Sequence, residues 1–152
     1  MGGNDPYSAS KGCSELVTSS YLNSFFKNNS SCSIASARAG NVIGGGDWAE
    51  DRIIPDFFRA ILNKEKLYVR NPNATRPWQH VLEPLGGYLL LASKLFLEGT
   101  RFSGGWNFGP SDNLNYKVSE LVNSIINYLG KGDVSFIENT EKPHEAGMLK
   151  LD

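Results

Sequence analysis

Apolar residues recur at steps of three and four positions in four stretches of the chain, a spacing typical of amphipathic helices. The stretches cover residues 7 to about 27, 51–62, 84 to about 98, and 118–129. Pro55 and Pro84 each fall in the first turn of a predicted helix, where a missing N–H leaves no intrahelical hydrogen bond unmade. We therefore predict four helices, each with one buried apolar face.

The predicted buried faces follow from the same spacing. On the first helix the apolar positions are Cys13, Leu16, Val17, Tyr21 and Phe25. On the second they are Ile53, Ile54, Phe57, Phe58, Ile61 and Leu62. On the third they are Leu85, Tyr88, Leu89, Ala92 and Leu95 or Phe96, and on the fourth they are Val118, Leu121, Val122, Ile125 and Leu129.

Short runs between these helices predict β-strands. Residues 33–38 are small and carry Ile34 in the middle, which favours a strand covered by helices on both faces. Further strands are expected at residues 66–70, 78–81, 105–108 and 134–137, with loops at residues 41–46 and 71–77. This alternation indicates an α/β protein, but the strands are too dispersed for a self-contained parallel sheet. We therefore expect the chain to be part of a larger domain.

The composition is that of an ordinary globular protein, with a formal net charge of −1 over 152 residues. The Lys and Arg residues are scattered, so no basic surface is expected to attract nucleic acid. No apolar run approaches the roughly 20 residues that cross a bilayer, and no signal peptide precedes the first helix, which predicts a cytoplasmic protein. Because Cys13, Cys32, His80 and His144 lack metal-ligand spacing, we expect reduced, structural cysteines and no metal.

Tyr7 and Lys11 are the first candidates for chemistry. Their four-residue separation places a phenol and an ammonium on the same face of the first helix. A phenol is a weak base at neutral pH, but a neighbouring cation stabilises its phenolate, which can then accept a proton from a hydroxyl. The same spacing also arises by chance in ordinary helices, so the surrounding residues decide between the two interpretations.

Five blocks of distinctive sequence follow one another along the chain. They are Asp5-Pro6-Tyr7-Ser8-Ala9-Ser10-Lys11, Arg38-Ala39-Gly40-Asn41-Val42-Ile43-Gly44, Asp51-Arg52-Ile53-Ile54-Pro55, Arg76-Pro77-Trp78-Gln79-His80-Val81 and Trp106-Asn107-Phe108-Gly109. In this order they resemble the extended short-chain dehydrogenase/reductase family. Two further stretches look most like its sugar-nucleotide 4,6-dehydratases, namely Gly44-Gly45-Gly46-Asp47-Trp48 and Lys142-Pro143-His144-Glu145-Ala146. The resemblance covers essentially the whole chain, but only the later part of those enzymes.

The resemblance implies part of an NAD-binding Rossmann-type fold, with the second half of the parallel sheet and the smaller C-terminal substrate-binding region. Residues 1–50 would hold the catalytic helix, the buried strand and a loop, and residues 51–152 would be mostly substrate-binding. The N-terminal βαβ unit is expected to be missing and the C-terminus truncated, so the isolated chain is expected to be inactive. In the full-length enzyme a homodimer is expected.

The resemblance also implies NAD as the cofactor and a nucleotide-sugar as the substrate. The reaction would be oxidation at sugar C4, loss of water across C5 and C6, and return of hydride to C6. Tyr7 would take the proton of the C4 hydroxyl beside the positively charged nicotinamide, and Lys11 would hold the nicotinamide ribose, so both would bind the cofactor. Asn41 would contact the substrate diphosphate, and Arg76 and Arg52 would bind its phosphates because a guanidinium forks onto two oxygens.

Each of these roles has a structural alternative. Asn41 would otherwise cap the turn after its strand, and Arg52 would otherwise pair with Glu50, Asp51 or Asp56 at the surface. The glycines at positions 44–46 favour a flexible turn over a phosphate-binding loop, because no Lys-Ser/Thr follows them. His80 and His144 have no suggestive carboxylate spacing, so neither is expected to be catalytic.

Two other functions remain open at this point. Nucleotide-sugar epimerases and decarboxylases of the same fold share the Tyr-x-x-x-Lys spacing and the Trp106 block. A non-catalytic assembly partner is the second alternative, in which Leu16, Tyr21 and Phe25 would form a face that packs against another subunit.

Overall fold

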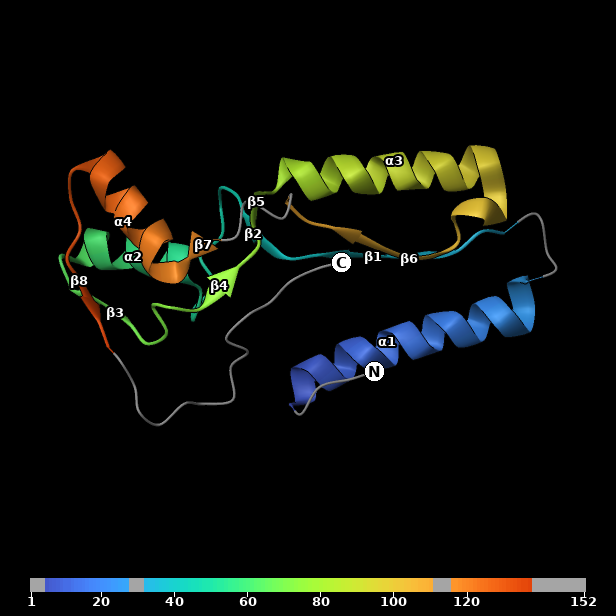
Figure 1. The fold of residues 1–152 in the computed structure, drawn as a ribbon, viewed down its shortest axis with the longest axis horizontal. Coiled ribbons are helices and arrows are strands. Elements are labelled where there is room, and N and C mark those ends of the chain that lie inside the picture. The colour runs from blue at the N-terminus through green and yellow to red at the C-terminus, as the bar shows by residue number, and fades with distance from the viewer. Residues whose placement is uncertain (1–4, 28–31, 111–115, 138–152) are drawn as a thin grey trace. The chain divides into compact units, whose positions relative to one another are not determined.

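The computed structural model describes residues 5–27, 32–110 and 116–137. The chain divides into two compact units, each made of two separate segments (Figure 1). The first unit comprises Met1–Arg38 and Leu82–Phe108, and the second comprises Ala39–Val81 and Gly109–Asp152. The assignment of catalytic and substrate-binding roles to residues 1–50 and 51–152 remains a prediction.

The first unit places a pair of strands between two helices. Strand β1 (Ala35–Ala39) is hydrogen-bonded to β6 (Gly104–Phe108). Helix α3 (Leu82–Glu98) covers one face of this pair, and α1 (Pro6–Tyr21) lies on the other (Figure 1). A π-helical turn, η1 (Leu22–Phe26), extends α1, and a 3-10 turn, η2 (Gly99–Phe102), follows α3. The predicted helix-strand-helix layering is confirmed, although the β1 side chains are half-buried and Ala37 is exposed.

Helix α1 presents a different face to the strands from the one that the apolar spacing predicts. No residue of α1 is buried, and Leu16, Val17, Tyr21 and Phe25 are all more than half exposed. The half-buried positions are instead Ser8, Ala9, Gly12, Glu15 and Thr18, followed by Leu22 and Phe26 in η1. The prediction of a buried apolar stripe was wrong, because the side of α1 toward the strands carries small residues and Glu15, which pairs with Arg38 on β1.

The buried face of α3 also differs from the prediction. Pro84 and Leu91 are buried, whereas Leu85 and Leu89 are exposed by 46% and 75%. Apolar residues lie on nearly every side of this helix, so their spacing does not single out one face. The close contact at Gly87 selects it, because a Cβ there would lie 2.3 Å from Cδ1 of Phe108.

The second unit is built on two helices and a pair of parallel strands. Helices α2 (Ile53–Asn63) and α4 (Val118–Leu129) pack with β3 (Leu67–Val69), which pairs in parallel with β8 (Val134–Phe136). The buried core consists of Phe57, Ala60, Leu67, Val69 and Val122. The bounds and the buried face of α4 are confirmed, and α2 begins two residues later than predicted because Arg52 has extended backbone. Its Phe58 and Leu62 are exposed rather than buried.

Two more strand pairs complete the second unit. Strand β2 (Asn41–Ile43) pairs in parallel with β5 (Trp78–His80), and β4 (Thr75–Arg76) pairs antiparallel with β7 (Tyr116–Lys117). The prediction of loops was therefore wrong over the first half of residues 41–46, and also over Thr75–Arg76 within the loop expected at residues 71–77. Glycines at both ends of β2 explain the strand, because a Cβ on Gly40 would lie 2.7 Å from Pro77 and one on Gly44 would lie 2.8 Å from Val81.

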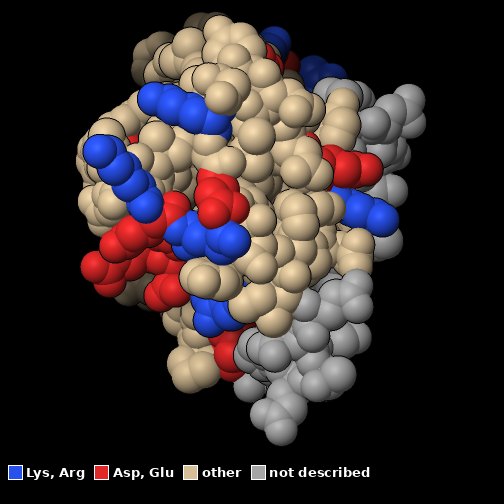
Figure 2. All heavy atoms as spheres, turned by 90° about the vertical axis from the view of Figure 1, so that its left-hand side faces the viewer, with Lys and Arg blue, Asp and Glu red and all other residues tan. Residues whose placement is uncertain are grey.

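No helix within the described ranges has the length and apolarity to cross a membrane. Figure 2 shows basic and acidic side chains mixed with uncharged atoms on the face that it draws. On this face acidic atoms gather toward the lower left, with basic side chains above and beside them (Figure 2).

Gly87→Ala should destabilise the chain by about 1 to 3 kcal/mol, because the new methyl group overlaps the Phe108 ring and forces α3 away from β6. The matched control is Gly86→Ala, one position away in the same helix, where a Cβ would meet nothing within 4 Å. That control should be neutral or stabilising by up to about 1 kcal/mol, since alanine is the better helix former. Urea unfolding measures both, and equal midpoints would contradict the packing described here.

Candidate active site

Tyr7 and Lys11 lie one helical turn apart at the start of α1. The Lys11 Nζ atom lies 5.7 Å from the centroid of the Tyr7 ring. The Tyr7 side chain is 72% exposed and Lys11 is exposed as well, so both polar heads can reach a ligand. The structure thus brings the two residues together as the four-residue spacing predicts.

The first turn of α1 is fixed by a side-chain cap. Asp5 Oδ1 accepts a hydrogen bond from the Ser8 backbone N–H at 3.0 Å, and the Ser8 hydroxyl also donates to the Asp5 carboxylate. Pro6 occupies the first helical position, where its fixed φ suits a helix start. The side-chain and backbone hydrogen bonds from Ser8 hold the pKa of Asp5 below its usual value. The hydrogen bonds between Asp5 and Ser8 therefore fix the backbone on either side of Tyr7.

A bidentate ion pair connects α1 to the strands. Arg38 Nε donates to Glu15 Oε1 at 2.6 Å, and Arg38 Nη2 donates to Glu15 Oε2 at 2.8 Å. Arg38 Nη1 also donates to Asn107 Oδ1 on β6 at 3.1 Å. The hydrogen bond from Arg38 lowers the pKa of Glu15, and the same bond raises the pKa of Arg38.

Glu15 was missed by the sequence reasoning. A signal for it was present, because Glu15 continues the four-residue steps from Tyr7 through Lys11. An arginine in a strand that helices cover also needs an acidic partner.

Asn41 and Arg76 both belong to the second unit. Asn41 is the first residue of β2 and is paired in register with Trp78 on β5. It therefore lies within a strand, and among the described residues its side-chain amide has no hydrogen-bond partner. Arg76 is half-buried on β4, where its Nη1 donates to the Thr75 carbonyl at 3.0 Å. The other guanidinium donors of Arg76 have no protein acceptor within the described ranges.

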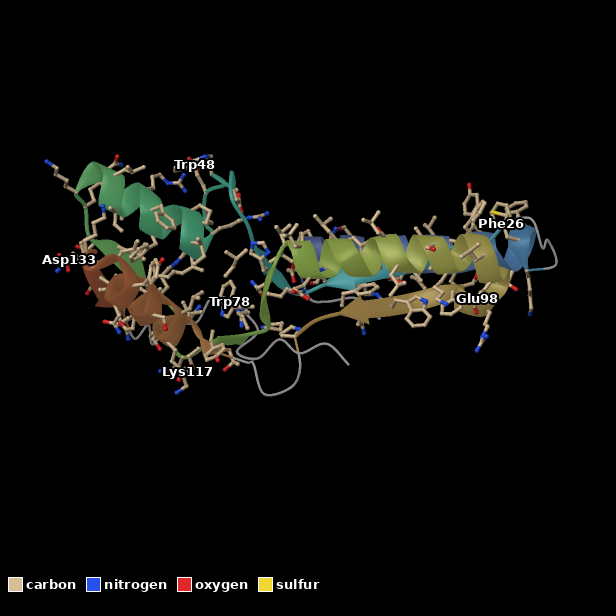
Figure 3. All side chains as sticks on the ribbon, turned by 90° about the horizontal axis from the view of Figure 1, so that it is seen from above. Phe26, Trp48, Trp78, Glu98, Lys117 and Asp133 are labelled. Carbon is tan, nitrogen blue, oxygen red and sulfur yellow. The ribbon has the colours of Figure 1, made fainter. Side chains whose placement is uncertain are left out.

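Arg52 lies at the start of α2 and takes part in a surface ion pair. Its Nη1 lies 3.2 Å from Asp47 Oδ2, and its side chain is 65% exposed. The partner is Asp47 rather than Glu50, Asp51 or Asp56; Asp51 pairs with Arg70 and Asp56 with Arg59. Figure 3 shows Trp48 in this segment and Trp78 on β5. The indole Nε1 of Trp78 is buried and has no hydrogen-bond partner in the part of the chain that the structure describes.

The predicted site residues are thus distributed over both units. Tyr7 and Lys11 belong to the first, and Asn41, Arg52 and Arg76 belong to the second. Their convergence on one ligand remains a prediction. His80 lies exposed on β5, while His144 and the Lys142–Ala146 motif lie outside the described residues. Cys13 and Cys32 are free thiols.

The fold and the Tyr7–Lys11 helix correspond to one class of protein. Residues 2–100 match the NAD dependent epimerase/dehydratase family, and the chain belongs to that family. It is 51% identical over 156 residues to CDP-glucose 4,6-dehydratase from Salmonella typhimurium (strain LT2), covering 100% of this chain and 44% of that protein. The chain therefore spans a little under half the length of this relative.

Solved structures show the same fold. UDP-N-acetylglucosamine 4-epimerase from Methanobrevibacter ruminantium M1, in complex with UDP-N-acetylmuramic acid, superposes with a TM-score of 0.76 at 23% identity over 98% of this chain and 45% of that one. DesIV, the dTDP-glucose 4,6-dehydratase from Streptomyces venezuelae with NAD and TYD bound, gives 0.74 at 21% identity over 100% of this chain and 44% of that one. The predicted fold class, part of a Rossmann-type α/β fold, is confirmed.

Acid should loosen the first turn of α1, because the pKa of Asp5 is lower in the folded chain than in the unfolded one. The stabilisation by its ionised carboxylate is complete above the unfolded value of about 4 and is lost as the pH falls through the folded pKa. In an NMR titration the Ser8 amide should shift across this range. Asp5→Asn is the control, since asparagine also caps helices but does not titrate. A Ser8 amide that shifts equally in both proteins would contradict this role of Asp5.

Proposed function

We propose that this chain supplies the catalytic helix and the substrate-binding residues of an NAD-dependent lyase, a nucleotide-sugar 4,6-dehydratase that converts CDP-glucose to CDP-4-keto-6-deoxyglucose in the cytoplasm. The observation that carries the proposal is the 51% identity to the Salmonella CDP-glucose 4,6-dehydratase along the whole chain. The adjacency of Tyr7 and Lys11 on an exposed helix face supports the proposal. Oxidation at C4 requires a base for the C4 hydroxyl proton, and a neighbouring cation makes a phenol such a base.

The donor set of α1 fits one end of the cofactor. A phenol O–H and an ammonium with three N–H donors, both exposed, match the hydroxyls of a nicotinamide ribose. NAD, when bound, would accept hydride from sugar C4 and return it to C6. Lys11 would hold the ribose and stabilise the Tyr7 phenolate, and Tyr7 would remove the proton of the C4 hydroxyl.

The substrate diphosphate would be held by the second unit. After bonding to the Thr75 carbonyl, Arg76 has guanidinium donors that no other described residue accepts, and these could bind phosphate oxygens. Arg52 is engaged with Asp47, but an exposed pair of this kind contributes only about 0 to 1 kcal/mol, so a diphosphate can displace it. Asn41 would add a neutral amide donor beside them.

An epimerase of the same fold is the first alternative. A 4-epimerase is among the solved structures of this fold, but at 23% identity it supports the fold alone. The much higher identity to the dehydratase favours loss of water over simple inversion at C4.

The exposed apolar face of α1 bears on two proposals. The second alternative, a non-catalytic assembly partner, rests on it, and it also supports a homodimer of the intact enzyme. Leu16, Val17, Tyr21 and Phe25 are exposed by 55% to 67%. We propose that this face packs against its copy in a homodimer of the intact enzyme, because burying it would recover the hydrophobic stabilisation that the chain alone leaves unused.

Tyr7→Phe should lower product formation at least about a hundredfold, because it removes the proton acceptor and leaves the ring in place. The assay would use a hybrid dehydratase, in which this chain replaces the matched segment of the Salmonella enzyme. The isolated 152-residue chain should give no product, since its sequence has no Gly-x-Gly-x-x-Gly for the cofactor pyrophosphate.

The matched control for Tyr7→Phe is Tyr128→Phe, which makes the same change at an 89% exposed position on α4. Its product formation should equal that of the unaltered hybrid. Near-normal turnover by Tyr7→Phe would show that Tyr7 is not the base.

A further inference from the structure

Arg38 lies where three elements of the first unit meet. Its guanidinium binds both carboxylate oxygens of Glu15 on α1 and the side-chain oxygen of Asn107 on β6. Gly105 leaves room for it, because a Cβ at that position would lie 2.4 Å from Arg38 Nη2. The contacts on β6 therefore fix the position of the Arg38 guanidinium that binds Glu15.

Within α1 itself, few side chains other than Glu15 can set the rotation of the helix about its axis; the half-buried Leu22 and Phe26 lie beyond it, in η1. No side chain of the helix is buried, and its half-buried positions include the small residues Ser8, Ala9 and Gly12. Small side chains interdigitate weakly, so packing alone permits the helix to turn. The two hydrogen bonds from Arg38 to the Glu15 carboxylate fix two distances at once, so the two side chains adopt one relative orientation.

The orientation of Glu15 determines that of the two predicted catalytic groups. Tyr7, Lys11 and Glu15 follow one another at four-residue steps, and each step turns the direction of the side chain by only about 40°. Glu15 lies about 12 Å along the axis from Tyr7, with continuous helix between them. If Glu15 allowed α1 to rotate, the Tyr7 phenol and the Lys11 ammonium would therefore turn with it.

We propose that Glu15 is a positioning residue for catalysis, and that its bond to Arg38 sets the rotation of α1 and aims Tyr7 and Lys11 at the cofactor and substrate. The proposal rests on the function proposed above. It also gives Asn107 a role, because Asn107 accepts a hydrogen bond from Arg38 and so helps to position the guanidinium that binds Glu15.

Glu15→Gln tests the proposal in the full chain, because the amide keeps the size of the side chain and replaces one acceptor oxygen with a donor. Hydrogen exchange of the α1 amides should accelerate at least about tenfold. The matched control is Glu98→Gln at the end of α3 (Figure 3), which has similar exposure but pairs with Lys94 and Arg101, both within four residues along the chain. It should leave α1 exchange unchanged. Unchanged α1 exchange in Glu15→Gln would overturn the proposal.

The second measurement separates positioning from simple anchoring. In the hybrid dehydratase, Glu15→Gln should lower kcat at least about tenfold and leave KM for the sugar nucleotide within about twofold, because misplaced groups impair the reaction more than binding. An unchanged kcat alongside faster exchange would overturn positioning. An unaltered hybrid without activity would overturn the proposed function, and the exchange experiment would still decide whether Glu15 holds the helix.

Discussion

The guanidinium of Arg38 has more donors than one carboxylate can accept, and the structure uses this surplus to join elements that are distant in sequence. Two N–H groups bind Glu15, 23 positions earlier on α1, and a third binds Asn107, 69 positions later on β6. Both partners lie on elements that pack on β1 or pair with it, and the missing side chain of Gly105 provides the space. The first unit thus depends on one arginine for the orientation of its N-terminal helix.

The sequence pattern located the four long helices and most of the strands, but it missed the short strands β2, β4 and β7 and did not always identify which faces the helices bury. For α4 it succeeded, because Val122 and its neighbours form a single apolar stripe on an otherwise polar helix. For α3 it failed, because leucines surround the helix and the close contact of Gly87 with Phe108 decides its orientation. Periodicity measures the contrast between faces, so it is uninformative for a helix that is apolar on all sides.

The case of α1 is different, because the apolar stripe exists but is turned away from the strands. Spacing along the helix predicted that Tyr7 and Lys11 would be neighbours, since this follows from helix geometry alone. It did not predict a role for Glu15, because the ion pair with Arg38 depends on how α1 packs against β1. The strand β2 was missed for a similar reason, because its short Asn-Val-Ile run between glycines becomes a strand only through pairing with β5.

The identity of the product tests the central claim most directly. CDP-glucose would be incubated with the hybrid dehydratase and NAD, and the product would be analysed by mass spectrometry and NMR. We predict a sugar nucleotide that has lost one water and carries a ketone at C4 and a methyl group at C6. A product of unchanged mass with inverted configuration at C4 would contradict the assignment and identify an epimerase.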